Sequence, residues 1–422
     1  MTESTTCCIV GGGPAGMMLG LLLARSGVEV LVLEKHGDFL RDFRGDTIHP
    51  STLEVLDEIG LGERFERLEH HKVRRLLVIT DDEEVPLVDL GLLRERHPHI
   101  AMVPQWDFLD MLAEEAGRYP NFTLRMNAHA YDLVREGRRV VGLRYTDATG
   151  DHEVRAALTV AADGRRSELR RATGLRSREY GAPMDVAWFR LPRAAGDRDD
   201  TFLRLAPGRV MVGINRMTYW QLAYLVPKGE YAQVRAAGIE ALRRRIGELL
   251  PFLADRTAAL DFTDISVLDV RVDRLRQWHL PGLLCIGDAA HAMSPIAGVG
   301  INLAIQDAVA TANLLTAPLR RGASPTSREL AAVQQRRQFP TAVIQRIQLL
   351  AQNALIGPTL GGTRAPRPPG PLVAARRFPP LARMVAQLIG HGPRPEHVRV
   401  PALPPRRTRP KRRTEAHHER PR

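Results

Sequence analysis

The hydrophobic pattern of the first 34 residues predicts a strand, a helix and a second strand. Residues 6–10 form a short apolar run, and a glycine cluster at 11–16 separates them from a helical run at 17–26. Gly27 is placed to end that helix as a C-terminal glycine. Residues 28–33 (VEVLVL) read as a strand buried on both faces of a parallel sheet. The chain therefore opens with a βαβ unit.

Helical and strand periodicities alternate through the rest of the chain. Residues 122–162 read as a β-meander, short strands dominate from about 181 to 275, and a buried strand returns at 283–286. We predict an α/β fold whose parallel sheet is assembled from separated segments, with an inserted antiparallel sheet. We expect helices at 51–59, 106–118, 231–246, 301–315 and 328–356, strands at 186–191, 209–214 and 219–226, and an amphipathic helix at 372–389 interrupted by Pro379-Pro380.

The first motif with chemical meaning is Gly11-x-Gly13-x-x-Gly16, followed by Glu34 at the end of the second strand. Gly11 permits a tight turn, Gly13 lets a pyrophosphate approach the backbone, and Gly16 lets the helix pack close to the strand. The helix N-terminus offers free N–H groups to phosphates, and a carboxylate at position 34 can accept hydrogen bonds from a ribose. Because all these parts are in place, we predict a dinucleotide site rather than a glycine-rich turn without a ligand.

A second motif spans residues 282–307 and separates FAD from NAD as the dinucleotide, which the first motif alone cannot do. Asp288 follows the strand at 283–286, where a carboxylate can bind the hydroxyls of a polyol. Gly300 to Asn302 open the next helix, and their N–H groups can meet a ring carbonyl that gains negative charge on reduction. A flavin has both a ribityl chain and such a ring. A cap on the turn would explain Asp288 alone, but not the run of Gly298, Gly300 and Asn302.

A third motif, Val160-Ala-Ala-Asp163-Gly164-Arg-Arg-Ser167-Glu-Leu-Arg170, delivers Asp163 to a turn at the end of an apolar strand. With these three motifs in this order, the sequence resembles the single-component (class A) flavoprotein monooxygenases of the para-hydroxybenzoate hydroxylase fold. The resemblance covers about residues 5–345. It implies a Rossmann-like FAD-binding domain of the GR2 type, an inserted antiparallel-sheet substrate domain and C-terminal helices.

The resemblance also implies which residues bind the cofactor. Glu34 would bind the adenosine ribose, Asp288 the ribityl chain, and Asp163 belongs to a motif linked to both FAD and NAD(P)H. The full implied set is Gly11, Gly13, Ala15, Gly16, Glu34, Lys35, Arg44, Gln105, Asp163, Asp288, Pro295, Gly300, Ile301 and Asn302. The implied domains are a discontinuous FAD-binding domain (1–75, 101–180 and 276–345) and a substrate domain (76–100 and 181–275). Beyond the resemblance we expect a C-terminal helical segment (346–400) and, from its Pro-, Arg- and His-rich composition, a disordered basic tail (401–422).

The implied activity is hydroxylation of an aromatic or polyketide-like small molecule with NAD(P)H and O2, through a flavin C4a-hydroperoxide. No second GxGxxG serves NAD(P)H, which agrees with a nicotinamide that visits a surface groove only briefly. Epoxidation, Baeyer–Villiger insertion and oxidative decarboxylation on the same scaffold stay open. An FAD reductase or oxidase without oxygen insertion stays open as well.

Substrate-side residues should come from the inserted sheet. Tyr219 and Gln221 share one face of a predicted strand, and Trp220 and Tyr224 share the other, because side chains alternate along a strand. For each of them, packing against helices is the favoured interpretation. His49 and His291 lie close to the flavin motifs, and we expect each to be a hydrogen-bonded structural histidine. We therefore assign no catalytic base.

The excess positive charge of the chain lies in its C-terminal residues. The net charge is +12, and residues 361–422 hold 15 Lys and Arg and three Glu, so residues 1–360 are formally neutral. We expect a solvated tail and no specific nucleic-acid partner, with tail binding to nucleic acid or an anionic surface as a remote alternative. Three cysteines without metal-ligand spacing, no secretory signal and no apolar run of about 18 residues favour a cytoplasmic protein without a membrane span.

Overall fold

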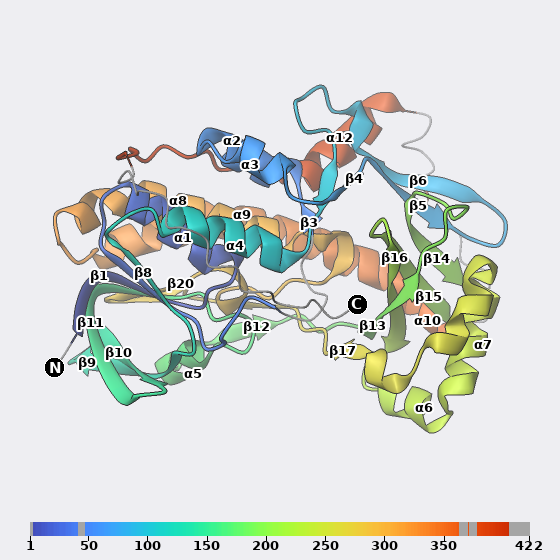
Figure 1. The fold of residues 1–422 in the computed structure, drawn as a ribbon, viewed down its shortest axis with the longest axis horizontal. Helices are drawn as coiled ribbons and strands as arrows, with labels where there is room; N and C mark the ends of the chain where they lie inside the picture. Colours follow the sequence, from blue (N-terminus) through green and yellow to red (C-terminus); the bar gives the residue numbers. More distant parts are fainter. Residues whose placement is uncertain (1–2, 41–46, 363–369, 371–377, 405–422) are drawn as a thin grey trace, which may run out of the picture.

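Two large sheets organise the chain in a computed structural model (Figure 1), which describes residues 3–40, 47–362, 370 and 378–404. The first sheet lies under a layer of long helices, and the second lies at the opposite end of the molecule. The described residues also form two smaller sheets. One has the order β3 (Thr47–Ile48), β7 (Ile100–Met102) and β4 (His71–Val73), and the other pairs β12 (Ser177–Glu179) with β18 (Asp273–Leu275).

The first sheet has a parallel centre, as the apolar runs predicted. Its path runs β19-β20-β11-β1-β2-β8, and the pairs β20–β11, β11–β1, β1–β2 and β2–β8 are all parallel. The predicted meander is formed by β9, β10 and β11, whereas β8 pairs in parallel with β2. Its strands are β1 (Glu3–Val10), β2 (Val30–Leu33), β8 (Phe122–Arg125), β9 (His129–Glu136), β10 (Arg139–Asp147), β11 (Gly150–Ala161), β19 (His279–Leu280) and β20 (Leu283–Cys285).

Helices α1 (Pro14–Arg25), α4 (Gln105–Ala116), α8 (Gly300–Arg320) and α9 (Ser327–Ala351) form the layer over this sheet (Figure 1). Pro14 occupies the first turn of α1, where its missing N–H costs nothing. Every residue from Ala15 to Ala24 is buried, since α1 is covered on all sides. Gly27, with φ of +82°, follows the end of the helix, as expected.

The second sheet has the order β17-β13-β16-β15-β14-β5-β6 and is antiparallel except for one pair. β14 and β5 run parallel, because β5 enters from a distant part of the chain and no hairpin constrains its direction. The strands are β5 (Arg75–Ile79), β6 (Glu84–Asp89), β13 (Met184–Pro192), β14 (Thr201–Ala206), β15 (Arg209–Asn215), β16 (Tyr219–Pro227) and β17 (Ser266–Leu268).

Two helical predictions differ from the structure, those at 231–246 and 328–356. The helix expected at 231–246 is two helices, α6 (Tyr231–Ala236) and α7 (Ile239–Leu249), because Gly238 between them has φ of +84°. Pro379 and Pro380 occupy the first turn of α12 (Pro379–Gly390), which proline suits, and residues 372–377 of the helix expected at 372–389 lie outside the described residues. The helix at 328–356 is α9 followed by a π-helical turn, Gln352–Ile356.

The remaining helices are short, and the C-terminal segment returns to α1. Leu403 N donates to Arg25 O at 2.7 Å and Ser26 Oγ donates to Pro401 O at 2.8 Å, so the first residues of the expected tail lie against this helix. Residues 405–422 lie outside the described residues. No helix within the described ranges is long and apolar enough to span a membrane. The short helices are α2 (Pro50–Glu58), α3 (Gly62–Glu66), α5 (Glu168–Thr173) and α10 (Gly357–Gly361).

Candidate active site

The three sequence motifs meet at the carboxyl edge of the parallel strands. Gly11 N donates to Leu33 O at 2.8 Å, and Ile286 N donates to Ala161 O at 3.0 Å, so each motif is tied to its neighbouring strand. A Cβ built on Gly287 would lie 3.2 Å from the Cβ atoms of both Ala15 and Ala304. The Gly-Asp turn therefore packs between the starts of α1 and α8. Ligands of open α/β sheets bind at this edge.

The glycines of the first motif have the geometry that their proposed roles require. Gly11 has φ of +106°, and a Cβ there would lie 2.4 Å from Ala162 O. A Cβ on Gly16 would lie 1.9 Å from Gly11 O, so the helix can pack this closely only with glycine. A Cβ on Gly13 would meet nothing within 4 Å, and no side chain caps α1. The N-terminus of α1 thus faces open space that fits a pyrophosphate.

Glu34 is fixed at the end of β2. Its Oε2 accepts from Gly12 N at 2.8 Å, and its Oε1 accepts from His36 N at 3.0 Å. Only 7% of the residue is exposed, whereas the neighbouring Lys35 is exposed. The glutamate therefore supports the glycine loop in addition to standing where a ribose would bind.

Asp163 begins the turn between β11 and α5. Its Oδ2 accepts from Glu168 N at 2.9 Å and from Leu169 N at 3.3 Å, so it holds the start of that helix. Burial raises the pKa of Asp163, although the hydrogen bonds of Ser167 and of the backbone oppose that shift. The carboxylate is thus largely engaged in shaping the turn, a role that the motif alone did not reveal.

Asp288 lies in the turn after β20 and forms an ion pair. Arg165 Nη2 donates to its Oδ2 at 2.9 Å and Nε to the same oxygen at 3.2 Å. About a quarter of each side chain is exposed, 25% for Arg165 and 26% for Asp288. The carboxylate is oriented and accessible at the mouth of the strand, and a polyol would share it with Arg165.

The start of α8 is held by the segment that contains β3. Asn302 Oδ1 accepts from His49 N at 2.9 Å and from Thr52 Oγ1 at 2.7 Å, and its Nδ2 donates to Thr47 O at 3.2 Å. The side chain of Asn302 therefore fixes the start of α8 to this segment, and no side chain caps the N-terminus of the helix. Gly298, with φ of +62°, accepts from Thr47 Oγ1 at 2.6 Å through its carbonyl.

A buried charge cluster behind the Gly-Asp turn escaped the sequence analysis. Asp307 Oδ2 accepts from Gly287 N at 3.0 Å and contacts His291 Nε2 at 2.6 Å, while its Oδ1 accepts from Arg337 Nε at 3.0 Å. Burial alone would raise the pKa of Asp307, but His291 and Arg337 outweigh it and lower the pKa. Arg337 also contacts Glu396 Oε1 at 3.4 Å, which ties the C-terminal segment to the turn.

Both histidines near the motifs are buried and hydrogen-bonded, as expected. His291 is 1% exposed and belongs to the charge cluster. His49 Nδ1 lies 2.8 Å from Ile389 O, and burial lowers its pKa to about 4. Gln105 begins α4 directly after β7, Pro295 precedes the turn Ile296–Gly298, and Ile301 follows Gly300 at the start of α8. Arg44 lies outside the described residues.

The two faces of β16 have different surroundings. Trp220 is fully buried, its Nε1 donates to Asp197 Oδ2 at 2.8 Å, and its ring lies 5.7 Å from that of Phe252, so the packing interpretation of Trp220 is confirmed. The opposite face carries Gln221 and Leu225. Ile296, in the turn before α8, packs against the apolar cluster that contains Leu225. That second face is therefore the one that adjoins the motif edge.

Comparison with known proteins assigns the family. The sequence profile of the FAD binding domain matches residues 4–347. The chain is 33% identical over 402 residues, 94% of each chain, to 6-methylpretetramide 4-monooxygenase of Streptomyces rimosus. It is 29% identical over 367 residues, 83% of this chain and 69% of the relative, to 12-dehydrotetracycline 5-monooxygenase/anhydrotetracycline 6-monooxygenase of Streptomyces rimosus subsp. rimosus.

A solved structure of similar fold is that of a probable FAD-dependent monooxygenase from Pseudomonas aeruginosa, with a TM-score of 0.72, 23% identity, and coverage of 85% of this chain and 97% of that one. The chain belongs to the FAD-binding family of class A flavoprotein monooxygenases. It is an oxidoreductase with FAD as cofactor and NAD(P)H as co-substrate, which confirms the predicted fold, cofactor and enzyme class.

Proposed function

We propose that this monooxygenase hydroxylates a polycyclic aromatic molecule of the polyketide type. The observation that carries the proposal is the 33% identity, over 94% of both chains, to an enzyme named for oxidising 6-methylpretetramide. The overall reaction joins one oxygen atom of O2 to a ring carbon and releases the other as water, while NAD(P)H is oxidised. FAD, when bound, supplies the electrons and the activated oxygen for this transfer.

The residues at the sheet edge fit FAD in the way that the family resemblance implies. The open space over Gly13 and the start of α1 would take the pyrophosphate, and Glu34 would bind the adenosine ribose. Asp288 would bind the ribityl chain beside Arg165, and the first N–H groups of α8 would face the flavin ring. Asp163 would contribute mainly by holding the turn after β11.

The substrate would lie between the start of α8 and the Gln221 face of β16. Ile296 packs against the apolar cluster on that face, which includes Val186 and Leu225, so the wall of the site excludes water. Gln221 is 2% exposed and projects from the same face, where its amide suits hydrogen bonding to a phenol or carbonyl of the substrate. The free, buried Cys7, Cys8 and Cys285 support the cytoplasmic location proposed from the sequence.

The purified holoenzyme can test this function with a panel of tetracyclic phenols, single-ring phenols and non-aromatic lipids. We expect tetracyclic phenols to stimulate NAD(P)H oxidation and to yield one hydroxylated product per NAD(P)H consumed. A Gln221→Ala variant should raise KM for these substrates more than it lowers kcat. Stimulation only by single-ring phenols would contradict the polyketide assignment. A reduced product, or hydrogen peroxide in place of product, would favour a reductase or oxidase.

A further inference from the structure

A cavity of about 430 Å³ lies apart from the flavin motifs. It is bordered by α3, by β4 and by the segment that leads into β7, and none of its lining residues belongs to the three motifs. Apart from Gly62, every residue that lines it has a polar or charged side chain, and two of these residues are histidines. The lining residues are Asp57, Gly62, Glu63, Glu66, Arg67, Lys72, Arg96, His97 and His99.

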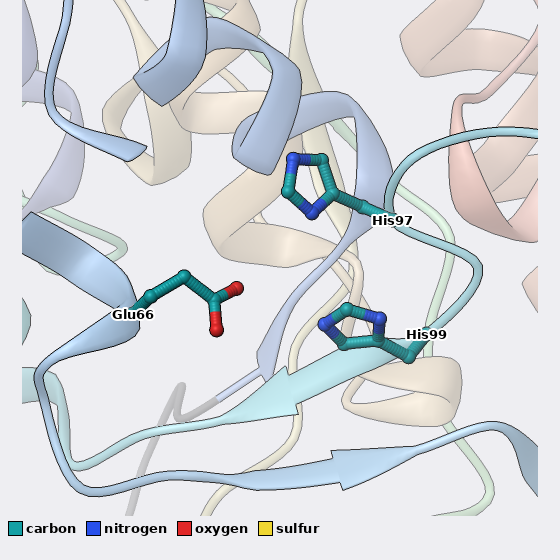
Figure 2. A group of neighbouring side chains, drawn as sticks. All are labelled: Glu66, His97 and His99. Carbon is teal, nitrogen blue, oxygen red and sulfur yellow. The ribbon is translucent and has the colours of Figure 1, made fainter. Parts of the chain in front are cut away.

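Glu66, His97 and His99 point into the same space (Figure 2). Each offers one ligand atom, and these atoms lie within 4.8 Å of one another. A tetrahedral Zn²⁺ with bonds of about 2.1 Å needs ligand atoms about 3.4 Å apart. Small side-chain rotations would therefore close the group around an ion. Glu66 is the last residue of α3, and His97 and His99 lie in the segment just before β7. An ion bound by all three would therefore connect these two segments.

His99 supplies an independent sign of a ligand. The residue is only 4% exposed, and its Nε2 is buried without a hydrogen-bond partner. Leaving a buried polar atom unpaired is costly, and a metal ion would satisfy it.

His97 is already oriented for coordination. Its Nε2 contacts Asp57 Oδ2 at 2.8 Å, which leaves the other ring nitrogen, Nδ1, to face the cavity (Figure 2). A carboxylate that holds the far nitrogen of a ligating histidine is the usual support of a metal site. The arrangement at His97 therefore provides both a ligand and the group that positions it.

From this geometry we infer that Glu66, His97 and His99 bind a divalent transition metal, Zn²⁺ above all, with a water molecule as fourth ligand. Two imidazoles select zinc-like ions over Mg²⁺ and Ca²⁺, which prefer oxygen ligands. Lys72 is the competitor, because its Nζ lies 2.6 Å from Glu66 Oε2. Its side chain is 43% exposed, so it can leave the carboxylate when the ion arrives.

The test uses the tag-free holoenzyme, dialysed against a chelator and then titrated with Zn²⁺ while bound metal is measured by calorimetry and elemental analysis. We expect one equivalent per chain, lost in Glu66→Gln and His99→Ala. Asp57→Asn should weaken binding by about 10–100-fold, as other supporting carboxylates do. Lys72→Gln should strengthen it, a gain that misfolding cannot produce. FAD content and Tm of every variant show that it is folded.

The matched control is His391→Gln. His391 lies near Glu54 and Glu95 in a second cluster of possible ligands, but its Nε2 is already engaged by Glu54 at 3.2 Å and Glu95 at 3.4 Å. We expect this variant to bind Zn²⁺ as the wild type does. The assignment is overturned if the wild type binds no equivalent, if His99→Ala binds normally, or if His391→Gln alone loses the ion.

Discussion

Replacing Asp307 with Asn should destabilise the protein strongly, although this residue does not border the open flavin edge. Its carboxylate is fully buried and contacts His291 Nε2 at 2.6 Å, Gly287 N at 3.0 Å and Arg337 Nε at 3.0 Å. An amide cannot accept from all three groups, and it leaves the buried Arg337 cation with only its longer contact to Glu396 Oε1 at 3.4 Å. Removing one member of a buried ion pair costs about 3–5 kcal/mol, which is the loss we expect for Asp307→Asn at neutral pH.

The sign of the pH dependence follows from the pKa of Asp307. His291 and Arg337 lower that pKa in the folded chain, against the opposing effect of burial. A carboxyl group with a lowered folded pKa stabilises the protein fully above its ordinary pKa of 3.8, and the contribution disappears as the pH falls through the folded value. The difference in stability between wild type and Asp307→Asn should therefore begin to shrink only as the pH falls below about 4, and it should continue to shrink as the pH falls through the lowered folded pKa.

Urea denaturation of the FAD-stripped proteins measures this difference without the contribution of cofactor binding. The matched control is Asp288→Asn, whose ion pair with Arg165 is partly exposed and should contribute at most about 1 kcal/mol to stability. The same control should bind FAD more weakly. Equal unfolding free energies for Asp307→Asn and wild type, within about 1 kcal/mol, would refute the view that this cluster holds the turn.

Three further substitutions separate stability from cofactor binding. Gly16→Ala places a Cβ 1.9 Å from Gly11 O and should cost about 1–3 kcal/mol in urea denaturation. Gly13→Ala meets no atom within 4 Å, so the apoprotein should keep its stability within about 0.5 kcal/mol while FAD binds about tenfold or more weakly by fluorescence titration; unchanged affinity would contradict a pyrophosphate site there. Asn302→Ala should cost about 1–3 kcal/mol for each of the two donors that it leaves without an acceptor, and a Tm equal to that of the wild type would contradict its structural role.

Local patterns predicted the features that depend on neighbours in sequence. The apolar run of β2, the buried α1 and the spacing of Gly11, Gly13 and Gly16 describe one βαβ unit, so the sequence was sufficient to predict it. The order of the three motifs then indicated the family. Domain limits and the cofactor roles of individual residues stay predictions.

Features that depend on tertiary contacts could not be predicted in this way. Asp307 is the one acidic residue of the largely apolar α8, which is only a weak sign in the sequence of a buried ion pair. The sequence gives no sign that Arg337 is its partner, because the two residues meet only when α9 packs on α8. The pairing of Arg165 with Asp288 likewise joins the turns after β11 and β20, which are distant in sequence. The parallel alignment of β5 with β14 has no local signature either, since no turn connects them.

We propose that this chain transfers one oxygen atom from O2 to an aromatic substrate with FAD held at the carboxyl edge of β1, β2, β11 and β20. The most direct measurement is turnover of the best tetracyclic phenol under ¹⁸O2 with NAD(P)H, followed by mass spectrometry of the product. We expect one ¹⁸O atom in a new hydroxyl group, and no label when ¹⁸O is supplied as water. An unlabelled product formed with full consumption of NAD(P)H would contradict it.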